Sequence, residues 1–331
     1  MDTKHRAAHG DNMKKILASL ALVFFSVSAA KAQLNAYFVN VGQGDATYIE
    51  LPNGSNVLID GGPSGLPIYE FLKGKGVTRI DHVVLTHPHN DHYRGLKKVF
   101  AAFDVKNFYD TKAENKDAVG DNNLRDLANA EPSCRTHFPE VGANLDWDKH
   151  VTIKVLNSCT EPVISRDNDV INNCSMVLRF YYNGHAILNM GDAEASVENA
   201  MAKIFKSGLN STYLKIGHHG SRYSSTDKFL ARVQPRVAII SVGQDNTYGH
   251  PHKESLDRIR ATGAQIFFTL TGTQSLTIPA PKRGVELLVN GQPDFGSITM
   301  TDAPKFNMEE RPFESADSAA LEQLKEAAAV K

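Results

Sequence analysis

The feature that most constrains this chain is a series of short apolar strands that each end in histidines or carboxylates. The clearest case is the apolar, β-branched run Ile80–Thr86, which is followed by three imidazoles and a carboxylate within His87–His92. Buried imidazoles and carboxylates are costly without partners, so a shared ligand explains this density better than packing does. Both groups are ligands of zinc and similar divalent metals. The segment therefore predicts a metal site at a strand end.

The same arrangement recurs further along the chain. Asp192 ends a second apolar strand, at a position from which a carboxylate can bridge two metal ions. His218 and His219 follow a third strand, and His250 and His252 follow a fourth. Of the 13 histidines, two lie in the first 32 residues, and seven of the remaining 11 lie in these motifs. This recurrence predicts that the strand ends converge on one site.

Periodicity predicts two strand-rich halves, each followed by helices. The elements expected in the first half span residues 34–41, 46–51, 56–60, 66–73 (helix), 80–86 and 91–103 (helix). Those expected in the second half span residues 151–156, 175–182, 186–190, 193–207 (helix), 212–216, 227–233 (helix), 237–242, 252–261 (helix) and 265–270. Residues 110–150 are polar with weak periodicity, which indicates a surface insertion. Two such halves suggest two sheets flanked by helices.

The first 32 residues have the pattern of a secretory signal peptide. Lys14 and Lys15 precede an apolar stretch over residues 16–30, which ends in a small-residue cleavage motif. That stretch is shorter than the ~20 residues of a membrane-spanning helix, so we expect cleavage rather than a stable membrane anchor. The protein is then exported, to the periplasm or the medium. Met13 is the expected natural start, with residues 1–12 outside the natural protein.

Charge and cysteine content narrow the classes of function. The 36 Lys and Arg against 37 Asp and Glu give a net charge of -1, and removing the five basic and two acidic residues of the leader makes it -4. An extended basic surface for nucleic acid is therefore not evident. Three cysteines leave open a Cys134–Cys159 bridge with Cys174 unpaired, or three free thiols. We expect residues 33–292 to form one domain and residues 293–331 a peripheral tail.

Taken together, the motifs resemble the metallo-β-lactamase superfamily. His87–His92 has its H-x-H-x-D-H signature. Further motifs resemble the hydrolase domain of the competence protein ComEC and its free-standing secreted relatives; they are Val41–Ala46, Leu58–Gly62, Asn172–Ser175, His218–Ser221 and Tyr248–Pro251. The resemblance covers residues 34 to about 262. It implies an α/β fold, the metallo-β-lactamase-type αββα sandwich, with a dinuclear metal site at one edge.

The resemblance also implies roles for individual residues. Asp192 bridges two divalent ions, with zinc preferred to manganese, between the pair His87 and His89 and the pair Asp91 and His92. Many members supply a further histidine where this chain has Asn172–Ser175, so His218 is the candidate ligand of the first ion. His250 then completes the second ion, and His219 contacts substrate or acts as an acid. Exchange of roles among His218, His219 and His250 stays open.

The expected catalytic residues are Asp91, Asp192 and His219. The expected substrate contacts are Asn173, Ser175, Ser221 and Tyr248, although Asn173 and Ser175 could instead only fix the entry to the hairpin. The expected structural supports are Asp45 and Asp60, and Asp45 could simply close the turn formed by Gly42 and Gly44. Basic and tyrosine side chains near the motifs are further candidates for contact with phosphate or bases; they are Arg94, Lys97, Lys98, Lys215, Arg222, Tyr93 and Tyr223.

These residues predict a metal-dependent hydrolase in which two ions lower the pKa of a bridging water from 15.7 towards ~7. The hydroxide would attack a phosphoester, so the leading interpretation is a phosphodiesterase or nuclease acting on DNA, a nucleotide or a small phosphodiester. One alternative is a β-lactamase or other acyl hydrolase. Another is a metal-dependent binding module without catalysis, although that would predict broken ligand motifs.

Overall fold

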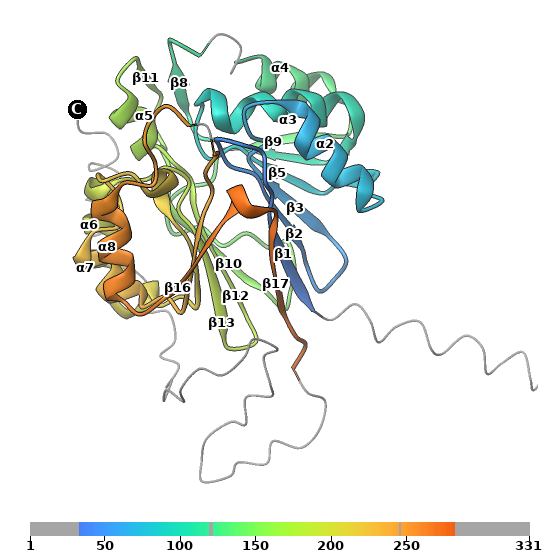
Figure 1. The fold of residues 1–331 in the computed structure, drawn as a ribbon. Helices are drawn as coiled ribbons and strands as arrows, with labels where there is room; N and C mark the ends of the chain where they lie inside the picture. The colour runs from blue at the N-terminus through green and yellow to red at the C-terminus, as the bar shows by residue number, and fades with distance from the viewer. Residues whose placement is uncertain (1–32, 119–121, 245, 282–331) are drawn as a thin grey trace, which may run out of the picture.

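The computed structural model describes residues 33–118, 122–244 and 246–281 (Figure 1). The predicted signal peptide and the predicted tail after residue 292 lie outside this range. Two mixed sheets pack face to face, one with strand order β17-β1-β2-β3-β5-β7-β9 and the other with order β10-β12-β13-β14-β15-β16. None of the helices in the described ranges is both long and apolar enough to cross a bilayer.

The strands of the first sheet are β1 (Leu34–Phe38), β2 (Thr47–Glu50), β3 (Asn56–Ile59), β5 (His82–Val84), β7 (Asn107–Tyr109), β9 (Arg135–His137) and β17 (Gln274–Ile278). Those of the second are β10 (Thr152–Asn157), β12 (Val177–Tyr182), β13 (His185–Asn189), β14 (Tyr213–Lys215), β15 (Val237–Ile240) and β16 (Gln265–Phe268). Two small pairs are β4 (Arg79–Ile80) with β6 (Asp104–Val105), and β8 (Ala113–Asn115) with β11 (Val163–Ser165).

The helices are α2 (Gly65–Gly74), α3 (Asn90–Ala102), α4 (Asn122–Ala130), α5 (Asn168–Asn173), α6 (Ala195–Ile204), α7 (Asp227–Val233) and α8 (Lys253–Ala261). Short 3-10 turns are η1 (Lys206–Leu209), η2 (Gly217–Gly220) and η3 (Thr269–Thr271). Helices α2, α3 and α4 cover the outer face of the first sheet, and α6, α7 and α8 cover that of the second (Figure 1). The αββα prediction is confirmed.

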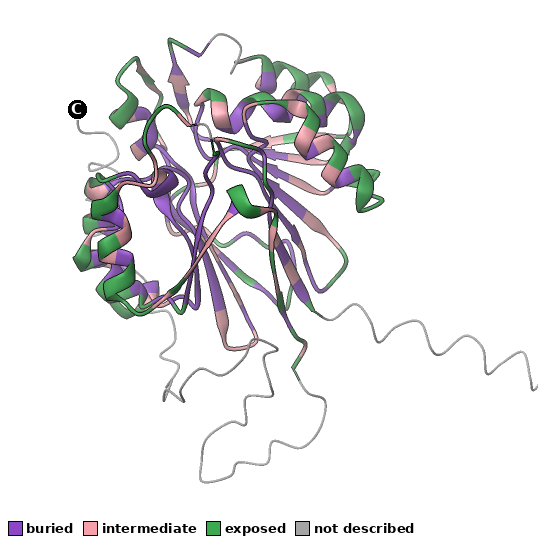
Figure 2. Ribbon diagram, viewed as in Figure 1, coloured by how far each residue is buried: buried purple, intermediate pink, exposed green. Residues whose placement is uncertain are grey.

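Three apolar clusters separate these four layers. The cluster between the sheets contains Phe38 and Phe180, one from each sheet. Leu96 on α3 belongs to the cluster outside the first sheet, and Met201 on α6 belongs to the one outside the second. The burial pattern in Figure 2 follows these layers, with buried sheets and helices that bury one face. Each helix therefore stabilises the fold by covering a sheet with its apolar stripe.

The polar segment 110–150 forms more than the expected surface insertion. Its strand β9 pairs in parallel with β7 and extends the first sheet. Its helix α4 buries Leu124 and Ala128 in the cluster outside that sheet. A short strand at the sheet edge carries too little alternation to be read from the sequence, because its position depends on pairing with β7.

The cysteines pair differently from the arrangement that the sequence left open. Cys159 and Cys174 form a disulfide with their Cα atoms 4.9 Å apart, and Cys134 is a free thiol. The Cys134–Cys159 bridge is therefore wrong. Both bonded residues are buried, in a small cluster with Ala113 and Ile171. Disulfide pairing follows Cα separation in the folded chain, which cysteine spacing alone cannot supply.

Candidate metal centre

The strand ends converge at one edge of the two sheets. Strands β3 and β5 are parallel neighbours, and so are β13, β14 and β15, so their carboxyl ends point to the same edge. Asp60 follows β3, His87 begins the motif after β5, Asp192 follows β13, and His219 follows β14. The convergence expected from the sequence is therefore present in the fold.

Asp192 lies at the centre of this group. Its Oδ2 atom is 3.3 Å from the Nε2 atoms of both His92 and His219, and 3.8 Å from that of His87. The Nε2 atom of His219 is also 3.2 Å from Oδ2 of Asp91. His92 belongs to three groupings with ligand atoms within 4.8 Å of one another, which are His87–His92–Asp192, Asp91–His92–His219 and Asp45–Asp60–His92; a fourth is Asp45–Asp192–His219.

Asp60 contacts His92 on the side of the ring that faces away from Asp192. It is fully buried and accepts hydrogen bonds from the Thr86 backbone N–H at 2.8 Å and the Thr86 hydroxyl at 2.7 Å. Nδ1 of His92 lies 2.8 Å from Oδ2 of Asp60. With Nδ1–H donating to this carboxylate, the lone pair of Nε2 faces Asp192. This is the supporting position that the sequence predicted for Asp60.

A close approach of α3 completes this support. The N–H of Gly61 donates to the carbonyl of His92, and the N–H of Gly95 donates to the carbonyl of Gly62. A Cβ atom at Gly95 would lie 1.8 Å from the Gly61 carbonyl oxygen, so no other residue fits there. The helix that carries Asp91 and His92 is therefore fastened directly to the loop after β3.

Several polar atoms at the centre are buried without a hydrogen-bond partner. They are Nε2 of His89, His92 and His219, and Oδ1 of Asp192. Buried polar atoms are normally satisfied, so four such atoms around one point indicate a ligand. Imidazole nitrogens and carboxylate oxygens are donors that divalent zinc and related ions accept. The residues present therefore fit a metal centre.

The charges at the centre match this chemistry. Burial raises the pKa of the Asp192 carboxyl, but the adjacent His219 and His92 outweigh that effect and hold the pKa well below its usual value. Burial and the nearby His92 and His89 rings lower the pKa of His87 well below its ordinary value. Asp192 is therefore ionised and His87 neutral at pH 7, which are the forms that bind metals. Burial lowers the pKa of His92 and His219, but the adjacent Asp192 outweighs that effect and raises the pKa of His92 well above its usual value and that of His219 to about 10. Both rings would therefore release a proton on binding a metal.

His219 rather than His218 belongs to the central group. Nδ1 of His219 lies 2.9 Å from the carbonyl oxygen of Ser241, which orients Nε2 towards the carboxylates. His218 is partly exposed, and its Nδ1 lies 2.7 Å from Oε1 of Glu194. No ligand grouping among the described residues includes His218. The structure therefore favours the exchange of roles between these histidines that the sequence left open.

His89 and His250 lie next to the groupings without joining them. Nδ1 of His89 is 2.9 Å from Nε2 of His87, and its own Nε2 atom is among the unpartnered atoms. The ring of His250 is centred 6.1 Å from that of His219 and 5.1 Å from that of His218. Tyr248 is exposed and stacks on His250 at 5.7 Å. Ligation by His89 and His250, and substrate contact by Tyr248, stay predictions.

The two serines expected to contact substrate are buried instead. The Ser175 hydroxyl accepts a hydrogen bond from the backbone N–H of Asp192 at 2.9 Å and lies 3.3 Å from Nδ1 of His87. The Ser221 hydroxyl accepts one from the N–H of Tyr223 at 3.3 Å. Both hydroxyls hold the site loops in place, so neither faces solvent.

A buried ion pair at the centre was not expected. Lys215 is fully buried, and its ammonium donates to the carboxylate of Asp45 and, at 3.1 Å, to the carbonyl of Gly191. The expectation that Lys215 contacts substrate phosphate is therefore wrong. Tyr93 is also fully buried, so it cannot stack on a base. A lysine at the end of an otherwise apolar strand was the available signal, because a buried charge needs a partner.

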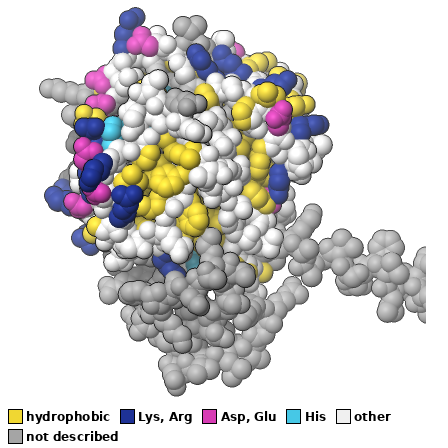
Figure 3. All heavy atoms as spheres, in the orientation of Figure 1, with side chains coloured by type: hydrophobic (Ala, Val, Ile, Leu, Met, Phe, Trp, Pro, Cys, Tyr) yellow, Lys and Arg dark blue, Asp and Glu magenta, His cyan; other side chains and the backbone are white. Residues whose placement is uncertain are grey.

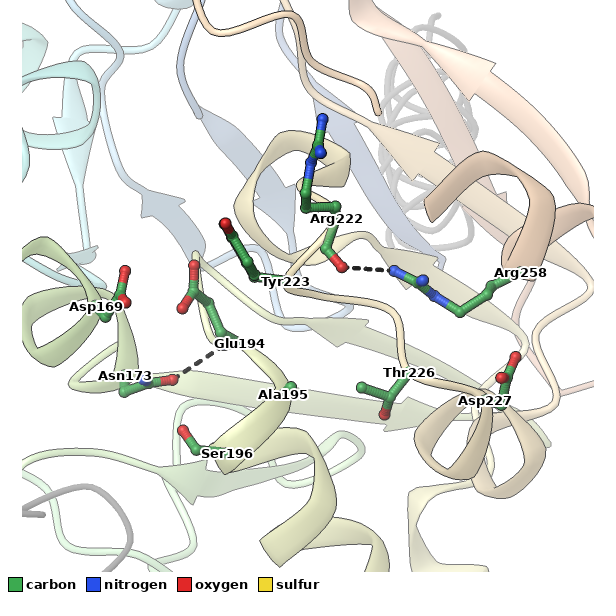
Figure 4. A pocket seen from close by; sticks show the side chains of 10 residues that line it. All are labelled: Asp169, Asn173, Glu194, Ala195, Ser196, Arg222, Tyr223, Thr226, Asp227 and Arg258. Atoms are coloured by element: carbon green, nitrogen blue, oxygen red, sulfur yellow. Dashed lines mark hydrogen bonds between the residues drawn. The ribbon is translucent and has the colours of Figure 1, made fainter. Parts of the chain in front are cut away.

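Glu194, two residues after Asp192 in the chain, lines a pocket of about 500 Å³ (Figure 4). Its lining residues are Asp169, Asn173, Glu194, Ala195, Ser196, Arg222, Tyr223, Thr226, Asp227 and Arg258. Asn173 accepts a hydrogen bond through Oδ1 from the N–H of Glu194 at 3.1 Å. Asn173 and Arg222 thus line the same pocket as Glu194, and their contact with substrate stays a prediction.

Residues 39–123 match the model of the metallo-beta-lactamase superfamily. This part of the chain, which includes the His87–His92 segment, is therefore similar to a metallo-beta-lactamase superfamily domain. It is similar to the ComE operon protein 3 of Bacillus subtilis, with 26% identity over 77% of this chain and 34% of that protein. It is also similar to the competence protein ComA of Neisseria gonorrhoeae, with 29% identity over 70% of this chain and 30% of that protein. The resemblance to competence proteins is confirmed.

Recombination protein 2 of Haemophilus influenzae is a third relative, 28% identical over 74% of this chain and 28% of its own length. The chain spans about a third of the length of the curated relatives it matches. Among solved structures, the metallo-beta-lactamase fold protein YhfI from Bacillus subtilis aligns with a TM-score of 0.50 at 11% identity, over 74% of this chain and 99% of YhfI. That likeness supports the fold alone.

Proposed function

We propose that this chain is an exported hydrolase that uses two divalent metal ions to cleave phosphodiesters, as a phosphodiesterase or nuclease. The observation that carries the proposal is the set of buried, unpartnered ligand atoms around Asp192. Relatives named for competence and recombination support a nucleic acid or nucleotide substrate. The Cys159–Cys174 disulfide and the predicted leader support an oxidising compartment outside the cytoplasm.

Two groups of side chains would hold the ions. The grouping His87–His92–Asp192 would hold one, and the grouping Asp91–His92–His219 would hold the other, with Asp192 3.3 Å from His219 as well. Divalent ions held there supply Lewis acidity and an activated water for hydrolysis at neutral pH. Zinc suits this histidine-rich set, and manganese is the alternative.

The residues around the centre would bind and orient the substrate. His218 is next to His219 in the chain, and its Nδ1 lies 2.7 Å from the carboxylate of the pocket residue Glu194, so it can contact a phosphoryl or leaving-group oxygen. The half-exposed Arg222 and the exposed Tyr223 line that pocket and offer a cation and an aromatic face. Arg94 is exposed and lies on α3 beside the centre.

The charge distribution supports a substrate that is contacted locally. On the face drawn in Figure 3, Lys and Arg side chains lie in small groups with acidic side chains among them. Extended duplex binding relies on many phosphate contacts, so such a surface favours a short or single-stranded phosphodiester over a long duplex.

An activity panel on the metal-loaded protein tests this function. The substrates are bis-p-nitrophenyl phosphate, single- and double-stranded DNA, a phosphorylcholine ester and a chromogenic cephalosporin. We expect turnover of a phosphodiester that is lost on chelation, restored by zinc or manganese, and absent from Asp192→Ala. Turnover of the cephalosporin alone would refute the proposal in favour of an acyl hydrolase, and full turnover by Asp192→Ala would refute the metal mechanism.

A further inference from the structure

We propose that the segment Asn172–Ser175, fastened by the Cys159–Cys174 disulfide, positions the metal ligands, so that reducing this disulfide weakens metal binding. The inference rests on the proposed metal centre and concerns the part of the chain where the histidine of many relatives is replaced. It assigns the segment a positioning role, because its side chains act through ligand residues.

Three residues of the segment contact the metal centre or the residues beside it. Ser175 accepts a hydrogen bond from the Asp192 N–H at 2.9 Å, and its hydroxyl lies 3.3 Å from Nδ1 of His87. Asn173 accepts one from the N–H of Glu194 at 3.1 Å, and Nδ2 of Asn172 lies 3.4 Å from Nδ1 of His218. Asp192 and its neighbours on the loop after β13 therefore depend on where this segment sits.

On its other side the segment is held by Asn157, by helix α5 and by a small apolar cluster. The Asn157 amide donates to the carbonyls of Asn173 and Ser175, at 2.9 and 2.8 Å. The preceding helix α5 has six residues, which is too short to be stable by itself. The apolar cluster beneath it consists of Ala113, Cys159, Ile171 and Cys174, with Val163 packed against it.

The disulfide is therefore the covalent part of a small anchor. It joins Cys174, next to Ser175, to Cys159, which lies between β10 and β11. Ligand sets lose affinity when their support moves by about 0.5 Å, because coordination geometry is strict. Releasing Cys174 would let α5 and Ser175 shift and would loosen the hold on Asp192.

Reduction of the bond is a balanced two-electron step. A phosphine takes an oxygen atom from water and becomes a phosphine oxide, and the disulfide gains two electrons and two protons to become two thiols. The same loss of the cross-link, without a reductant, is made by the double substitution Cys159→Ala/Cys174→Ala. Cys134→Ala is the matched control, because Cys134 is a free thiol away from the segment.

Zinc affinity of the full chain, measured by competition with a chromophoric chelator, tests the proposal. We expect an affinity about 10–100-fold weaker in the phosphine-reduced protein and in Cys159→Ala/Cys174→Ala, as for other losses of ligand support, and an unchanged affinity in Cys134→Ala. The visible spectrum of the cobalt(II)-loaded protein should change in the same two proteins that lose zinc affinity. Circular dichroism shows whether each protein is folded. If the double variant does not fold, the phosphine-reduced wild-type protein still tests the effect of losing the disulfide.

Ser175→Ala separates a positioning role from a general loss of stability. The combined variant carries Ser175→Ala together with Cys159→Ala/Cys174→Ala. If the disulfide acts through Ser175, this variant should lose little more zinc affinity than the Ser175 or the cysteine substitutions alone, whereas independent effects would multiply. A folded protein that lacks the disulfide and binds zinc within twofold of wild type would overturn the inference and leave the proposed function intact. A wild type that binds no divalent metal would overturn both.

Discussion

Replacing Asp60 with Asn removes a carboxylate that three donors share, at nearly constant side-chain shape. The donors are the N–H and hydroxyl of Thr86 and Nδ1–H of His92, all within 2.8 Å. An amide keeps one acceptor oxygen and turns an NH2 group towards the rest, so at least one buried donor loses its partner. Each such loss costs about 1–3 kcal/mol, so we expect the free energy of unfolding to fall by about 2–4 kcal/mol.

The same substitution should weaken metal binding, because Asp60 sets which nitrogen of His92 carries the proton. Without the carboxylate the ring can rotate or change tautomer, and Nε2 no longer faces Asp192 reliably. Loss of a comparable outer partner weakens metal affinity by about 10–100-fold.

Urea unfolding of the metal-free protein and chelator competition measure the two effects separately. Asn tolerates the positive φ of 58° at residue 60, whereas Asp60→Ala adds about 1–2 kcal/mol of backbone strain and serves as the harsher comparison. An Asp60→Asn protein that loses stability and keeps metal affinity within about twofold would refute the orienting role and leave only the bracing one.

Three other substitutions test buried charges. The substitution Lys215→Met leaves the Asp45 carboxylate buried without its cation, so the free energy of unfolding should fall by about 3–5 kcal/mol. The double substitution Asp45→Asn/Lys215→Met should recover most of this loss. Failure to recover it would contradict the pairing. Burial raises the pKa of Glu198 to about 7, so the stability that the protonated side chain contributes below about pH 4.5 is lost as pH rises to about 7. The substitution Glu198→Gln should remove this decrease of about 3 kcal/mol in the free energy of unfolding. A dependence of stability on pH that is unchanged in the variant would count against it. Burial lowers the pKa of His82 to about 4, so the stability that the neutral ring contributes is lost as pH falls from about 6.5 to about 4. The substitution His82→Phe can keep the stacking on Trp147 and should remove up to about 3 kcal/mol of this acid-dependent loss, measured by thermal unfolding. The same dependence on acid pH in both proteins would refute this.

The sequence predicts the elements best where an apolar pattern alone determines them. The helix expected at 227–233 is found as α7 (Asp227–Val233), because Phe229, Leu230 and Val233 form a buried stripe. The strand expected at 56–60 is one residue shorter as β3, since Asp60 leaves the strand with a positive φ. The position of the metal centre was predictable for a related reason. Parallel strands that end in ligand residues must present them at one edge.

Tertiary pairing accounts for the features that the sequence did not predict. Strand β9 and helix α4 exist because β7 and α3 offer them a partner, and the polar composition of 110–150 hides this. The choice of Cys174 over Cys134 as the partner of Cys159 depends on how α5 folds back against β11. Neither relation leaves a periodic signal, because each depends on residues that are distant along the chain or lie in short segments.

Lys215 shows why residue type alone misassigned a charge at the site. Strand β14 lies between parallel neighbours and is buried along its whole length, so its last side chain had to be buried as well. A buried ammonium must find a carboxylate, and Asp45 stands 170 residues earlier in a glycine-containing loop. The lysine that seemed suited to substrate phosphate instead neutralises a carboxylate next to His92 and His219, and it ties that carboxylate to the loop of Asp192. Arg222 lines the pocket, is half-exposed and pairs only with the equally exposed Glu254 at 3.4 Å in the described part of the chain, so its guanidinium can still turn to a phosphodiester. Arg222 rather than Lys215 is therefore the basic residue on which substrate affinity should depend.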